Sequence, residues 1–97
     1  MKSKKNNTPQ MKLIRNKIDL IDSKLLPLMV KRSKLVEKAL ELKVKRAEIV
    51  DQKRIREITK KISQETKKLG GNSKLLSDIW LSIIDNFIKF EKDKFKK

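Results

Sequence analysis

The chain has no cysteine, no histidine and no tyrosine among its 97 residues. Without cysteine there are no disulfide bonds, no thiolate zinc site and no cysteine nucleophile. Without histidine, the commonest general base and the commonest metal ligand are missing. The composition therefore disfavours the most frequent kinds of nucleophilic and metal-dependent catalysis.

Glycine and long apolar runs are also scarce. The two glycines, Gly70 and Gly71, lack the GK[ST] ending of a phosphate-binding P-loop. The longest apolar run, residues 25–30, is far too short to span a bilayer. The N-terminus has no apolar stretch after its lysines, as a signal peptide would. We therefore expect a soluble, cytoplasmic protein without a membrane segment.

Positive charge is abundant, because 27 lysines and arginines face 12 acidic residues and give a net charge of +15. Such a balance suits nucleic acid, an anionic membrane surface or an anionic small molecule. Nearly all of this charge is lysine, and the few arginines are Arg15, Arg32, Arg46, Arg54 and Arg56. Arginine pairs with a carboxylate through two parallel hydrogen bonds, so a sparse arginine in a lysine-rich chain indicates specific recognition.

Helical spacing of apolar residues dominates the first half of the chain. Thr8 followed by Pro9 is typical of a helix start, with an N-cap and a proline at the first helical position. The apolar pattern continues to about Lys45. Proline inside a helix usually kinks it. Because the pattern keeps its phase across Pro27, it predicts one long kinked helix rather than two.

Two shorter helices are predicted in the second half. Residues 46–50 form a short connection, and Asp51 is a candidate N-cap for the second helix. Gly70 can end that helix in a left-handed conformation. Asn72 or Ser73 can then cap a third helix whose apolar residues recur at intervals of three and four.

The fold class is therefore all-α, with a disordered basic tail at residues 1–8 and one helical domain at residues 9–95. A first helix of about 36 residues spans roughly 54 Å. A compact domain of this size has a radius of gyration of only about 13 Å. The two shorter helices barely cover such a helix, so we expect an intertwined homodimer with two-fold symmetry.

Several cationic side chains and one carboxylate are candidates for an anion-binding site. On one continuous helix, Arg32 and Lys43 would point the same way about 16 Å apart, and Arg15 would lie about 100° round from Arg32. Arg15 would then serve the site of the partner subunit in an antiparallel dimer. Arg54 opens the second helix and Glu91 lies late in the third, so both can close on the same space.

An ordered set of residues matches a known pattern. The set is Arg15, Ile18, Asp19, Ile21, Asp22, Arg32, Lys43, Asp51, Arg54 and Gly70. Over about residues 11–92 the chain resembles the all-helical (AroQ) class of chorismate mutase. The resemblance implies an isomerase of aromatic amino-acid biosynthesis, in the shikimate pathway, that rearranges chorismate to prephenate. This pericyclic reaction needs no nucleophile, metal or cofactor.

The resemblance also implies a role for each candidate. Arg32 and Arg15 of the partner subunit would pair with the two carboxylates of chorismate. Lys43 and Glu91 would donate hydrogen bonds to the ether oxygen of the breaking bond, and Arg54 would support the polar end. The implied catalytic residues are Lys43, Glu91 and Arg32, and the implied substrate-binding residues are Arg15, Arg32, Asp51 and Arg54.

Three positions depart from the family pattern. Ile55 stands where the family commonly has a glutamate that holds the substrate hydroxyl, Phe87 where a small polar residue is common, and Glu91 where glutamine is frequent. A non-catalytic member of this fold, or one that eliminates pyruvate from isochorismate, therefore stays open. A basic helical module that binds nucleic acid is a further alternative, which the lack of any recognised nucleic-acid motif disfavours.

Overall fold

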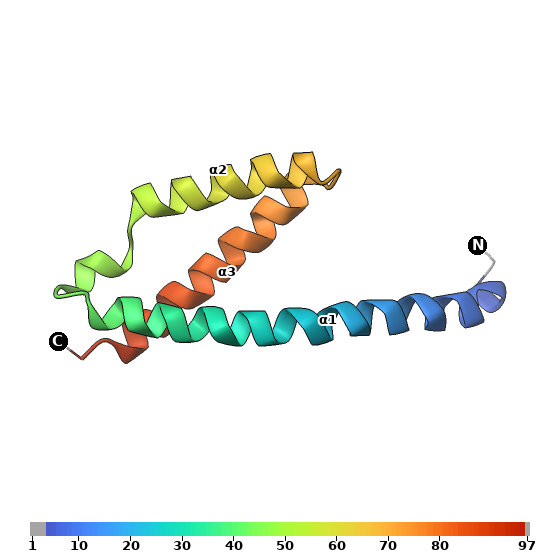
Figure 1. Cartoon of the computed structure of the whole chain (residues 1–97), viewed down its shortest axis with the longest axis horizontal. Helices are drawn as coiled ribbons and strands as arrows, with labels where there is room; N and C mark the ends of the chain where they lie inside the picture. Colours follow the sequence, from blue (N-terminus) through green and yellow to red (C-terminus); the bar gives the residue numbers. More distant parts are fainter. Residues whose placement is uncertain (1–3, 97) are drawn as a thin grey trace. The chain divides into compact units, whose positions relative to one another are not determined.

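The computed structural model describes the backbone of residues 4–96 and the side chains of residues 8–96. It contains α1 (Lys4–Glu41), the 3-10 helix η1 (Arg46–Ile49), α2 (Gln52–Lys68) and α3 (Ser73–Lys94), shown in Figure 1. These described residues include no β-strand, so the predicted all-α class is confirmed. The chain divides into an N-terminal unit, residues 1–34, and a C-terminal unit, residues 35–97.

The start of α1 differs from the prediction. The helix begins at Lys4, so Thr8 lies inside it and is not its N-cap. Of the predicted tail, residues 1–3 lie outside the described residues, and residues 4–8 belong to α1. Pro9 pointed to a later start because proline is favoured at the first helical position. A proline further inside a helix is tolerated at the cost of one backbone hydrogen bond.

Pro27 does not interrupt α1, which confirms one helix rather than two. Proline has no N–H to bond the carbonyl four residues earlier, which belongs to Ser23. Separately, the Ser23 hydroxyl donates to the carbonyl of Asp19 at 2.9 Å. Such bonds from a serine to the preceding turn often accompany helix bending. The bend at Pro27 stays a prediction.

An apolar stripe runs along α1 in the N-terminal unit. It consists of Ile14, Ile18, Ile21, Leu25 and Leu28, whose exposed fractions range from 49% to 61%. Arg32 follows Ile14 by eighteen residues, which is five full turns, so its backbone faces the same direction as the stripe. A surface that covered the stripe would therefore also reach Arg32.

The end of α1, in the C-terminal unit, also differs from the prediction. The helix stops at Glu41 rather than near Lys45, and the amide of Lys43 closes a final turn on the carbonyl of Leu40 at 3.0 Å. Lys43 therefore lies beyond the helix, and its predicted alignment with Arg32 on one helical face is wrong. Residues 46–49 of the expected connection form η1.

The predicted boundaries of α2 and α3 are confirmed where capping residues set them. The Asp51 carboxylate accepts from the amide of Arg54 at 3.0 Å, and the Asn72 side chain accepts from the amide of Leu75 at 2.9 Å. Gly70 has a positive φ of 77°, as a left-handed helix end requires. These caps fix where α2 and α3 begin and where α2 ends.

The buried side chains of the C-terminal unit come from α1, η1, α2 and α3. Leu40, Ile49 and Ile84 are its buried apolar residues, with Ile49 only 4% exposed. Thr66 is buried too, and its hydroxyl donates to the carbonyl of Ile62 at 2.6 Å. The fifth buried residue, Glu91, carries charge. Ile49 thus anchors η1 beside α3.

No helix within residues 4–96 is both long and apolar enough to cross a membrane.

Candidate active site

The closest contact between predicted site residues joins Lys43 and Glu91. The ammonium Nζ of Lys43 lies 2.7 Å from Oε1 of Glu91. Lys43 belongs to the connection between α1 and η1, and Glu91 to the last turns of α3, 48 residues later. The side chain of Lys43 is 23% exposed and that of Glu91 is 8% exposed. The two residues therefore form a charged pair that is largely shielded from solvent.

Burial makes this pair strong and costly to disturb. A buried carboxylate needs a partner because desolvation penalises the charged form, and a charge-assisted hydrogen bond is roughly twice as strong as a neutral one. A lysine ammonium has three donor hydrogens. The bond to Glu91 orients this ammonium.

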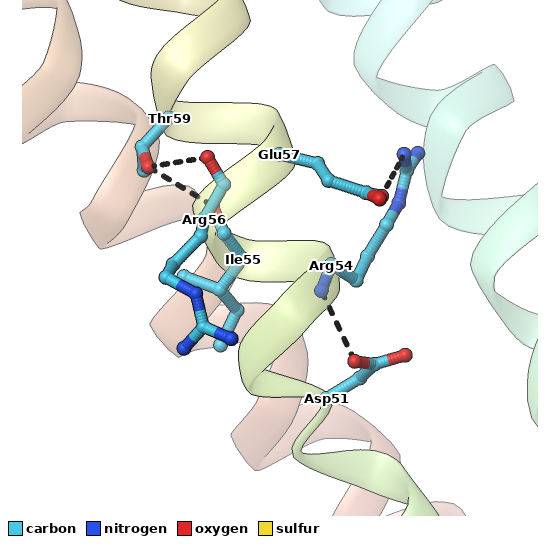
Figure 2. A network of polar contacts seen from close by, with 6 residues as sticks. All are labelled: Asp51, Arg54, Ile55, Arg56, Glu57 and Thr59. Atoms are coloured by element: carbon cyan, nitrogen blue, oxygen red, sulfur yellow. Dashed lines mark hydrogen bonds and ion pairs between the residues drawn. The ribbon is translucent and has the colours of Figure 1, made fainter.

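Asp51 and Arg54 lie at the start of α2. The hydrogen bond between them comes from the backbone amide of Arg54, not from its guanidinium. Asp51 caps the helix by accepting from the Arg54 amide. The Arg54 guanidinium lies 3.9 Å from Glu57, and both side chains are more than half exposed. Figure 2 shows these contacts along one side of α2, with Ile55 pointing away from that side. An exposed pair of this kind contributes little to stability, so the guanidinium can exchange Glu57 for another anion.

Two of the departures from the family pattern are half-buried residues. Ile55 on α2 is half-buried and has no side chain that accepts a hydrogen bond. Phe87 is also half-buried, and its ring packs edge-on against Phe90 at a centroid distance of 6.3 Å. Both positions thus hold apolar side chains where the pattern has polar ones.

The other two predicted residues belong to the N-terminal unit. Arg15 is exposed, whereas Arg32 is half-buried and its Nη1 atom is shielded from solvent. Both lie on the unbroken helix α1, where seventeen residues separate them by about 25 Å. One straight helix cannot bring them into one pocket. That two subunits share them stays a prediction.

Two contacts beside the Lys43–Glu91 pair were missed from the sequence. Arg46 Nη1 donates to the carbonyl of Lys92 at 3.2 Å. Glu48 Oε1 accepts from the amides of Val44 at 3.1 Å and Lys45 at 2.8 Å. The rarity of arginine marked Arg46, and Glu48 follows Lys45 at the spacing of a capping box. The capping box was overlooked because its N-cap position holds Lys45 rather than a serine or threonine.

The described residues define an all-helical protein whose candidate site residues are four cations and two carboxylates, of which Glu91 is buried. Within that part of the chain, no group of three or more acidic side chains could hold a metal ion. The family model of chorismate mutase type II matches residues 14–92. The chain belongs to this family. Comparisons with curated proteins and with solved structures find no significant match.

Proposed function

We propose that the protein rearranges chorismate to prephenate. The observation that supports this most is the 2.7 Å contact between Lys43 and Glu91 in a member of the chorismate mutase type II family. The reaction breaks an ether bond while a carbon–carbon bond forms within the same molecule. Catalysis then requires a fixed substrate conformation and stabilisation of negative charge on the ether oxygen.

Lys43 is the residue best suited to that charge. Its ammonium is a charged hydrogen-bond donor held in place by the contact with Glu91. A preorganised donor to developing negative charge is typically worth about 10² to 10³ in rate. Glu91 either orients this ammonium as a carboxylate or, when protonated, donates to the ether oxygen itself. The rate of a Glu91→Gln variant distinguishes these roles, because a neutral amide can donate a hydrogen bond but cannot hold the ammonium by charge.

The two carboxylates of chorismate would be held by arginines of the N-terminal unit. We propose that Arg32 binds one carboxylate and Arg15 of the partner subunit binds the other, with Arg54 and Asp51 at the polar end. A bidentate arginine fork suits a carboxylate better than a lysine does. The net charge of +15 would also attract a dianion from solution.

This arrangement requires a homodimer. The apolar stripe of α1 is half exposed in a single chain, and contiguous exposed apolar surface usually marks an interface. A second copy would cover the stripe and approach Arg32 at the same time. Sedimentation at micromolar concentration should therefore give twice the monomer mass, and a stable monomer would contradict the shared site.

The activity is tested by incubating purified protein with chorismate and following the loss of chorismate and the appearance of prephenate. The Lys43→Met variant should lose nearly all of the rate. The Lys60→Met variant, which removes an equal charge from an exposed position of α2, should keep it. Absence of turnover by the unmodified protein would refute the proposal.

Ile55 favours a second candidate within the same fold. A half-buried isoleucine cannot accept the hydrogen bond of a substrate hydroxyl, and a buried polar group left without a partner costs about 1–3 kcal/mol. Elimination of pyruvate from isochorismate, or binding without turnover, would then replace the rearrangement. Release of pyruvate from isochorismate, measured beside chorismate loss in the same preparation, separates these outcomes.

A further inference from the structure

Lys43 occupies an irregular connection, so helical geometry does not set the position of its ammonium group. The helix ends at Glu41 and η1 begins at Arg46, which leaves Lys43 between two regular elements. A flexible lysine stem in such a place samples many rotamers unless its backbone is fixed. The 2.7 Å contact with Glu91 therefore depends on whatever holds this connection against α3.

Glu48 holds the backbone that follows Lys43. One carboxylate oxygen, Oε1, accepts from the amides of Val44 and Lys45, the two residues directly after Lys43. These amides would bond the carbonyls of Leu40 and Glu41 if α1 continued. Glu48 thus ends the helix and fixes the turn, while the neighbouring Ile49 is buried and anchors η1.

Arg46 contacts α3 next to Glu91, the second member of the pair. Its Nη1 donates to the carbonyl of Lys92, the residue directly after Glu91. The carbonyl of Glu91 already accepts from the amide of Phe95 at 2.9 Å. Lys92 is in the last turn of α3, where carbonyls have no partner within the helix and a cation is favourable. Arg46 therefore caps α3 and ties η1 to it beside Glu91.

We propose that Glu48 and Arg46 are positioning residues that hold the Lys43 ammonium against Glu91. Glu48 fixes the connection just after Lys43, and Arg46 fixes that connection to α3 just after Glu91. Neither needs to touch the substrate. The catalytic consequence rests on the proposed function, whereas the effect on the Lys43–Glu91 contact does not.

The kinetic experiment compares variants with matched controls. Glu48→Ala and Arg46→Gln should each lower kcat for chorismate by about 10- to 100-fold, because a displacement of about 1 Å can cost 10²-fold. KM should change little, since neither residue binds the substrate. Glu48→Gln should retain the rate, because an amide oxygen accepts the same two bonds. Lys92→Gln, which removes a neighbouring charge but keeps the carbonyl, should also be unaffected.

A second experiment does not depend on turnover. The coupling between Lys43 and Glu91 is measured by a double-mutant cycle of Lys43→Met and Glu91→Gln in urea unfolding. The coupling free energy between Lys43 and Glu91 should be measurable in the otherwise unmodified protein. It should be lost when the same cycle is measured in proteins that also carry Glu48→Ala or Arg46→Gln. It should persist in the Lys92→Gln background.

The outcomes separate the two proposals. Variants of Glu48 or Arg46 that are less stable but keep both kcat and the coupling would overturn the positioning role. Equal losses for Glu48→Ala and Glu48→Gln would overturn the backbone role of Glu48, because they would indicate that only its charge matters. An unmodified protein that leaves chorismate intact but shows the background-dependent coupling would refute the proposed function alone.

Discussion

Replacing Lys43 by methionine should affect stability and catalysis in ways that can be separated. Methionine keeps much of the aliphatic stem and removes the ammonium, so Glu91 loses its partner at 2.7 Å while its side chain stays only 8% exposed. Breaking a fully buried pair by removing one partner costs about 3–5 kcal/mol, and leaving a buried group unsatisfied costs about 1–3 kcal/mol. Lys43 is 23% exposed, so water can reach the gap. We expect a loss of about 2 kcal/mol.

The double variant Lys43→Met/Glu91→Gln should recover most of that loss, because a neutral amide is much cheaper to bury without a charged partner. With a urea dependence of about 1–3 kcal/mol per molar, the single variant should unfold at roughly 1 M less urea than the unmodified protein. Trp80, the single tryptophan of the chain, reports the transition by fluorescence. All samples need the same protein concentration, because dimerisation makes apparent stability concentration-dependent.

Catalysis should not recover with stability. Both variants lack the ammonium, so both should lose about 10² to 10³ of the rate with chorismate. Equal urea midpoints for the single and double variants would show that Glu91 does not depend on Lys43. Recovery of rate in the double variant would show that the ammonium is not the donor to the ether oxygen. Either result would refute the reasoning from the pair.

Two further predictions concern the proposed pocket. Ile55→Glu should raise kcat/KM for chorismate by about tenfold through a new charged hydrogen bond, and an unchanged kcat/KM would mean that residue 55 does not meet the substrate. Arg32→Lys should raise the Kd for chorismate, measured by calorimetry, more than Arg54→Lys does, because the Nη1 atom of Arg32 is shielded whereas the side chain of Arg54 is 66% exposed. The reverse order would place the main carboxylate contact at α2.

The boundaries of α2 and α3 could be predicted because short-range chemistry sets them. Asp51 and Asn72 each bond an amide three residues ahead, and Gly70 adopts the positive φ that other residues avoid. Each of these interactions involves residues close in the chain. A single sequence therefore contains the information needed to place them.

Both ends of α1 were misjudged because their determinants are weaker or less direct. Pro9 is compatible with a helix start but does not require one. At the C-terminal end, the apolar pattern could not indicate that the Glu48 side chain would accept hydrogen bonds from the amides of Val44 and Lys45. The helix therefore stops before Lys43. The misplaced helix end had produced the predicted alignment of Lys43 with Arg32, which is wrong. The choice of Lys43 as a candidate did not depend on helical geometry alone.

The contact between Lys43 and Glu91 could not be found from periodicity at all. The two residues are 48 positions apart, and one of them is on no helix. Only the resemblance to a family linked them, by assigning both to one ether oxygen. The tertiary contact becomes visible when the connection packs beside α3 through Ile49 and Arg46.

In the proposed homodimer, the position of Arg32 would connect subunit association with substrate binding. Its backbone faces the same way as the apolar stripe, so a partner that covers the stripe also lowers the local dielectric constant around the guanidinium. Attraction between opposite charges strengthens as the dielectric constant falls. An arginine at the edge of a covered stripe can therefore bind a carboxylate more tightly than the same arginine on an exposed helix. Under this proposal, apolar burial between subunits and recognition of a dianion would depend on the same segment of α1.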